Sequence, residues 1–130
     1  METVKKNLAF KYLSNFEKEE MEVLLYEYER YIKFSGSVRT PLVIVLIVGG
    51  IMRSMKHNMS SNQFIFVVMA IVLLLALAIW LVAIAYKIIR QKKFVKNKLE
   101  TMASVQNYPF KEVRKEFNTL VRATYKGPKV

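Results

Sequence analysis

One uncharged segment constrains this chain more than any other feature. From Phe64 to Tyr86, 23 consecutive residues carry no charged or strongly polar side chain. As a helix with a rise of about 1.5 Å per residue, the segment would be roughly 34 Å long, enough to cross a hydrocarbon core of about 30 Å. A chain of 130 residues is too short to surround a helix that is apolar on every face. We therefore expect a membrane-spanning helix here.

The chain also has an earlier apolar run, Pro41–Met52, which is the first of the two in the sequence, is shorter and leaves alternatives open. Isolated runs of this length also occur as buried, interfacial or re-entrant segments. Arg39 and Arg53 bracket the run, and their long side chains can extend to the headgroups and lengthen the effective span. We predict spans at about 39–55 and 64–89, joined by a short connector at 53–63.

The charge distribution predicts the orientation of these spans. Residues 1–41 hold equal numbers of basic and acidic side chains, whereas residues 87–130 hold twelve Lys or Arg and three Glu. Positive charge is enriched on the cytoplasmic side of membrane proteins. We therefore expect a multi-pass integral membrane protein with both termini on the cytoplasmic (or matrix or stromal) side. Nucleic acid is not expected as a partner, because the excess charge lies beside the bilayer.

Six cations follow the long apolar run within twelve residues. They fit a topology anchor, and the same charges can attract the headgroups of anionic membrane lipids. The six residues of this basic stretch are Lys87, Arg90, Lys92, Lys93, Lys96 and Lys98.

Small residues within the two runs are candidates for helix packing. Membrane helices associate without much hydrophobic drive, so close backbone approach at small residues supplies much of their contact. Gly49 and Gly50 lie in the first run, and Ala76 and Ala83 repeat at seven residues in the second. The alternative is that alanine and glycine are simply common in such helices.

Amphipathic patterns stand on both sides of the membrane runs. Ser14 and Glu17 match a capping box that opens a helix, and Ser35-Gly36-Ser37 is expected to break that helix before the membrane. Each stripe is too short to fold alone in water, so it must pack on the other stripe, on a partner or on the bilayer surface. We assign both to partner binding. The stripe residues are Met21, Leu24, Leu25, Tyr28 and Ile32 before the membrane, and Phe110, Val113, Phe117, Leu120 and Val121 after it.

The predicted fold is therefore an all-α membrane protein. A two-span transmembrane helical hairpin carries amphipathic helices before and after it. The expected parts are an amphipathic segment at 1–37, the hairpin at 38–89 and a basic helical segment at 90–130.

The composition offers little for catalysis. The chain has no Cys and no Asp, and His57 is its single histidine. Ser60 and Ser61 lie near His57, but no Asp is present to orient the imidazole. The Glu residues between 17 and 29 have no histidine beside them and fit a solvated helix face better than a metal site. We expect no enzymatic activity, no cofactor and no small-molecule substrate.

The leading functional hypothesis is an accessory or scaffolding subunit of a membrane complex. It would dock a partner protein, or form a homo-oligomer, through its hairpin and flanking helices. The alternative is a membrane-perturbing protein that acts by oligomerisation. In architecture alone, a short two-span chain with a basic tail resembles phage holins and other small pore-forming effectors.

Overall fold

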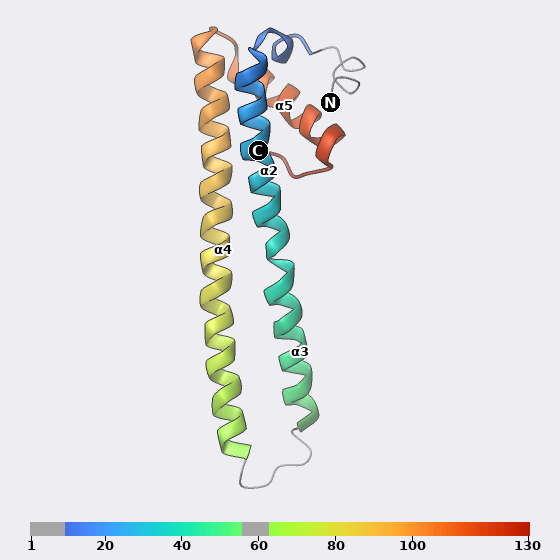
Figure 1. Ribbon diagram of the computed structural model, residues 1–130, viewed down its shortest axis with the longest axis vertical. Helices are drawn as coiled ribbons and strands as arrows, with labels where there is room; N and C mark the ends of the chain where they lie inside the picture. The colour runs from blue at the N-terminus through green and yellow to red at the C-terminus, as the bar shows by residue number, and fades with distance from the viewer. Residues whose placement is uncertain (1–9, 56–62) are drawn as a thin grey trace. The chain divides into compact units, whose positions relative to one another are not determined.

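The computed structural model describes residues 10–55 and 63–130, and every regular element in these ranges is a helix. The elements are η1 (Leu13–Asn15), α2 (Lys18–Ser37), α3 (Arg39–Met55), α4 (Gln63–Val105) and α5 (Phe110–Tyr125), shown in Figure 1. The sequence predicted an all-α fold. The described residues form helices and no strands, which confirms that prediction for this part of the chain. The predicted connector, including His57, Ser60 and Ser61, lies mostly outside them.

The chain divides into two compact units. The amphipathic unit holds residues 10–33 and 89–130, and the apolar unit holds residues 34–55 and 63–88. Helices α2 and α4 each contribute to both units, because each continues through a unit boundary. Two stretches, Lys18–Ser54 and Phe64–Val105, are long and apolar enough to cross a membrane.

The first helix begins later than the sequence predicts. Ser14 lies in η1, and its hydroxyl donates to the carbonyl of Phe10 at 2.8 Å, so it does not cap α2. The backbone N–H of Met21 donates to the carbonyl of Glu17 at 3.1 Å, and α2 starts at Lys18. The predicted capping box is therefore wrong, because a 3-10 turn at residues 13–15 uses the serine locally.

The predicted break before the first apolar run is also smaller than expected. Helix α2 continues through Ser35 and Gly36 to Ser37, and Val38 alone separates it from α3. The Ser37 hydroxyl donates to the carbonyl of Phe34 at 2.7 Å, which satisfies this polar group within the helix. Pro41 occupies the first turn of α3, where a missing N–H costs nothing.

Two left-handed residues end α4 and α5. Asn107 has φ 54°, and the N–H groups of Asn107 and Tyr108 donate to the carbonyls of Ser104 and Ala103. This Schellman arrangement stops α4 and turns the chain into α5 after Pro109. Lys126 has φ 51°, and its N–H donates to the carbonyl of Arg122, which ends α5.

The core of the amphipathic unit is built from three helices and two short segments. Apolar residues of α2, α4 and α5 face one another, and η1 packs against α5. Leu13, Phe16 and Val130 close the ends of the core. The buried residues of the three helices are Met21, Leu24, Leu25, Tyr28, Tyr31, Val95, Leu99, Met102, Ala103, Val113, Phe117, Leu120 and Val121.

Both helices of the apolar unit have covered positions, and those on α4 form a regular stripe. Along α4 from Phe64 to Ile88, one residue in every three or four is buried or half-buried, and this pattern repeats every seven residues. A seven-residue repeat is the spacing at which two helices keep one seam in contact over several turns. The seam residues are Val67, Ala70, Leu74, Leu77, Leu81, Ile84 and Ile88. All other side chains of this stretch are exposed.

Candidate functional site

The two stripes that the sequence assigned to a partner lie in the core of the amphipathic unit. Met21, Leu24, Leu25 and Tyr28 on α2 are buried, as are Val113, Phe117 and Leu120 on α5, while Phe110 is half-buried. The Tyr28 and Phe117 rings meet edge to face with their centroids 5.8 Å apart. Of the three alternatives left open by the sequence, the structure has the stripes packing on each other. A partner does not reach them while this core is folded.

Tyr28 links α2 to the segment after α5. Its ring is fully buried, and its hydroxyl donates to the carbonyl of Pro128 at 2.6 Å. Burial raises the pKa of Tyr28 to about 12; neighbouring Tyr31 adds to the rise and Arg122 opposes it. The phenol is therefore held neutral, which suits a hydrogen-bond donor inside an apolar core.

The chain after α5 folds back over the same tyrosine. A Cβ on Gly127 would overlap the hydroxyl of Tyr28 and come within 2.9 Å of Cδ1 of Ile32, so this close approach requires glycine. Tyr125 donates its hydroxyl to the Glu29 carboxylate at 2.8 Å. Burial, followed by this hydrogen bond, raises the pKa of Tyr125 to about 12. These contacts attach the last residues to α2.

The carboxylate of Glu116, on α5, caps η1. The backbone N–H groups of Lys11, Tyr12 and Leu13 all donate to the Glu116 carboxylate at 3.0 Å. An anion that receives three N–H groups at the start of a helical turn satisfies donors that the turn leaves unpaired. Local sequence gave no signal for this role, because the partners lie about one hundred residues apart.

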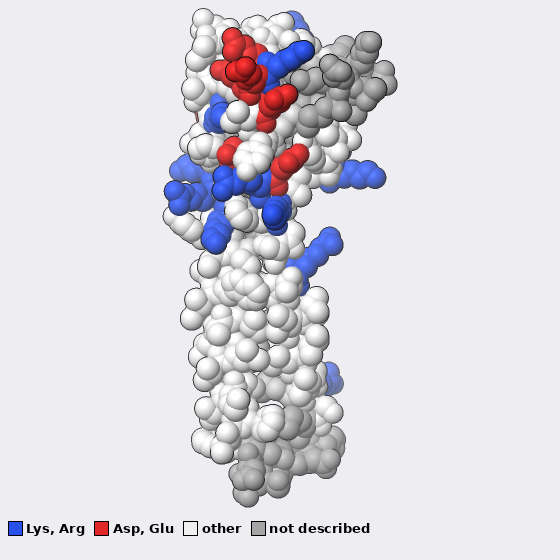
Figure 2. Space-filling model, in the orientation of Figure 1, with Lys and Arg blue, Asp and Glu red and all other residues white. Residues whose placement is uncertain are grey.

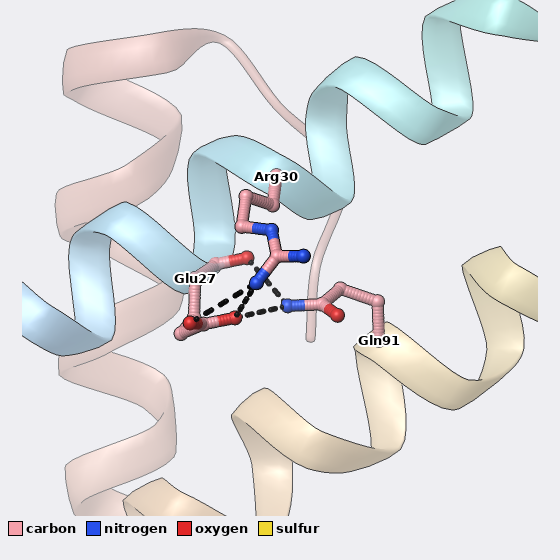
Figure 3. A network of polar contacts seen from close by, with 3 residues as sticks. All are labelled: Glu27, Arg30 and Gln91. Carbon is pink, nitrogen blue, oxygen red and sulfur yellow. Dashed lines mark hydrogen bonds and ion pairs between the residues drawn. The ribbon is translucent and has the colours of Figure 1, made fainter.

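One polar network joins α2 to α4 (Figure 3). The Gln91 side-chain amide donates to the backbone carbonyl of Glu27 at 3.1 Å and to its carboxylate at 2.6 Å. Arg30 lies 3.5 Å from the same carboxylate. A polar residue among apolar seam positions fixes the register of two helices. Gln91 and Asn97 are the two uncharged polar residues within the basic stretch, and the sequence alone did not distinguish the role of Gln91 from that of Asn97.

Charge is distributed unevenly over the amphipathic unit. Glu17, Glu19, Glu20 and Glu22 are exposed at the start of α2. At the other end of that helix segment and at the start of the α4 segment, Lys33, Arg90, Lys92 and Lys93 are exposed. Figure 2 shows most of the Glu side chains on this face toward one end of the unit and most of the Lys and Arg side chains toward the other, with some of each sign between them. The basic end is the end from which α4 continues into the apolar unit.

The other three cations of the basic stretch differ in how exposed they are. Lys87 is exposed, whereas Lys96 and Lys98 are half-buried. Their positions follow from the seam, because Gln91 is half-buried and Val95 and Leu99 are buried on the core side of α4. The cations that follow the apolar run most closely are therefore the most accessible.

A groove remains open between α2 and α4 within the amphipathic unit. Its volume is about 560 Å³. Phe94 and Val105 are 50% and 77% exposed, although both are large apolar residues. Glu17 and Glu20 supply carboxylates on the α2 side, and Lys98 is the single cation in the lining. The other lining residues are Asn97, Thr101, Met102 and Gln106.

The four small residues that were predicted to pack the helices lie outside the covered stripes. Gly49, Gly50, Ala76 and Ala83 are all exposed, and no described atom lies within 4 Å of a Cβ built on either glycine. Leu77 and Ile84, at 5% and 7% exposed, supply the buried positions of the seam. The four small residues therefore do not pack the helices of their own unit together. A role in contacts with another molecule stays a prediction.

Groups that could hold a metal ion do not occur in residues 10–55 and 63–130: no cluster of three or more His, Cys, Asp or Glu side chains is found there. Comparison with known proteins supplies no relative, since no protein-family model, curated protein or solved structure matches the chain. The function is therefore argued from the geometry and charge of the surfaces described above.

Proposed function

We propose that this chain is a two-span integral membrane protein that docks a partner protein through its amphipathic unit, as an accessory or scaffolding subunit. The exposed side chains of α3 and of α4 up to Tyr86 support the two spans. Each Å² of apolar surface left in water costs about 25 cal/mol, whereas lipid tails contact the same side chains without that cost. The basic stretch after Tyr86 supports a cytoplasmic (or matrix or stromal) location for the amphipathic unit.

The observation that carries the docking role is the groove between α2 and α4. The core is closed on its other side by α5, and its stripes are buried, so they offer a partner nothing. Phe94 and Val105 keep apolar surface exposed along the groove, while Glu17 and Glu20 give one of its walls negative charge. An amphipathic helix with an apolar ridge and basic flanks fits this chemistry.

Matched aromatic substitutions test the groove. Phe94 lines it, whereas Tyr26 is an equally exposed aromatic residue of α2 that does not. Tagged full-length chain, purified in mild detergent and analysed by quantitative mass spectrometry, should lose a copurifying protein with Phe94→Ser and retain it with Tyr26→Ser. Retention of every partner by Phe94→Ser would contradict the proposal.

A second candidate is a membrane-perturbing effector that acts as an oligomer. The exposed positions of Gly49, Gly50, Ala76 and Ala83 favour it, because close contact between copies would have small residues available. Dye leakage from vesicles that contain the pure protein separates the two functions. A scaffold should cause no leakage. Leakage that Gly50→Leu abolishes and that Leu46→Ala preserves would favour the effector.

A further inference from the structure

The exposed cations at the basic end of the amphipathic unit form a collar around two helices. The collar comprises Arg30 and Lys33 on α2 and Arg90, Lys92 and Lys93 on α4. Along α4, residues 90–93 all lie within about 11 Å of the last residue of the apolar run at about 1.5 Å per residue. Their charges therefore stand at the depth of the headgroups if that run spans the bilayer.

The Glu27–Gln91 contact places α2's cations at the same end of the unit. Gln91 binds Glu27, and the groove brings Glu17 and Glu20 beside Lys98 and Thr101. Residue numbers therefore rise along α2 as they fall along α4, so the two segments are antiparallel. Arg30 and Lys33 consequently lie beyond Glu27 toward the start of the α4 segment, where Arg90 is located.

The carboxylates near the collar are already engaged. Glu27 accepts from Gln91 at 2.6 Å and lies 3.5 Å from Arg30. Glu29 accepts from Tyr125 at 2.8 Å. The Arg30–Glu27 contact is the one salt bridge found among the described residues. Lys33, Arg90, Lys92 and Lys93 thus have no ionic partner within that part of the chain.

We propose that this collar binds the headgroups of anionic phospholipids. Unpaired cations beside a bilayer gain about 1 kcal/mol each from an anionic surface, and arginine can hold a phosphate with two parallel hydrogen bonds. The inference rests on the proposed membrane insertion of the apolar unit. It adds a lipid preference that a topology anchor alone does not require.

The only tryptophan, Trp80, is half-exposed on α4 and reports the lipids that contact the protein. The full-length chain would be reconstituted into phosphatidylcholine vesicles that contain phosphatidylglycerol. The quencher would be a bromine-labelled acyl chain carried by one lipid or the other. We expect phosphatidylglycerol to be preferred about fivefold around Trp80, which corresponds to about 1 kcal/mol. High salt should reduce the preference by screening.

The triple variant Arg90→Gln, Lys92→Gln, Lys93→Gln should lose the preference. Its matched control, Lys111→Gln, Lys115→Gln, Lys129→Gln, removes the same number of exposed cations away from the collar and should keep it. A wild-type protein without a preference, or equal loss in both variants, would overturn the collar alone. Absence of quenching by either lipid would overturn membrane insertion, and the collar with it.

Discussion

The amphipathic unit buries most of its large apolar side chains, whereas the apolar unit exposes most of its own. In the first, Tyr28 and Phe117 are fully covered and charged side chains face outward. In the second, Leu75, Ile79 and most of their neighbours face outward, and one seam is covered. The first arrangement is typical of a protein unit in water, and the second is compatible with the lipid surroundings proposed for the two spans.

The units also differ in how their helices are held in place. The amphipathic unit uses long-range hydrogen bonds from Gln91, Glu116 and Tyr125 in addition to its core. The described part of the apolar unit relies on a repeat of apolar seam residues. Polar contacts define a unique register, whereas a uniform apolar seam defines it more weakly. Substitutions in the two units should therefore have different costs.

The largest expected difference comes from core truncation. Phe117→Ala should destabilise the amphipathic unit by about 3–5 kcal/mol, because it empties a fully buried aromatic site. Leu75→Ala removes an outward-facing side chain of the apolar unit and should change stability little. Hydrogen exchange of α2 and α5 amides, measured on the full chain in detergent, checks both. Equal destabilisation by the two variants would contradict the comparison.

The next largest difference in stability is expected between alanine substitutions at two glycines, Gly127 and Gly36. Gly127→Ala should cost about 1–3 kcal/mol, because the added methyl group overlaps Tyr28. Gly36→Ala meets no described atom within 4 Å and lies inside α2, so it should stabilise by about 0.5–1 kcal/mol. Thermal unfolding of the full chain measures both shifts. Destabilisation by Gly36→Ala would instead favour the helix break that the sequence predicted there.

The carboxylate cap of η1 should have a smaller, local effect. Glu116→Gln weakens three N–H contacts and should cost about 1–2 kcal/mol. Glu112→Gln, also on α5, changes an exposed carboxylate and serves as the control. Faster amide exchange at Lys11, Tyr12 and Leu13 should appear only in the first variant. Unchanged exchange at these three amides would rule out the cap.

The last effect appears only at alkaline pH. The folded chain raises the pKa of Tyr28 and Tyr125 from 10.0 to about 12, mainly through burial. Stability from the neutral phenols is fully present below pH 10 and is lost as the pH rises toward about 12. Ultraviolet titration of tyrosinate should show a late phase. Tyr28→Phe should shrink that phase. Absence of a late phase would contradict the burial of both phenols.

Local periodicity was sufficient to predict the helices and their apolar faces. The α2 and α5 stripes follow from side chains three and four residues apart, so a sequence pattern contains them. It could not decide what covers each stripe, since that depends on another part of the chain. The roles of Glu116 and Gly127 were missed for the same reason: each acts on residues about one hundred positions away.

The local prediction of a capping box failed for a different reason. Ser14 and Glu17 match a capping box, but η1 uses the serine before α2 begins. In the second apolar run, the sequence indicated a repeat of seven on Ala76 and Ala83. The structure has the same repeat on another face, through Leu77 and Ile84. Small side chains mark the period of such a helix, but larger ones fill its seam.

In the proposed topology, two spans hold the amphipathic unit on the cytoplasmic (or matrix or stromal) side. The chain has no cysteine, so single cysteines can be placed at Ser14, in η1, and at Ser60, in the predicted connector. A membrane-impermeant thiol reagent applied from outside should label the Ser60→Cys chain and spare Ser14→Cys until the membrane is opened. Labelling of Ser14→Cys in intact membranes would contradict the account.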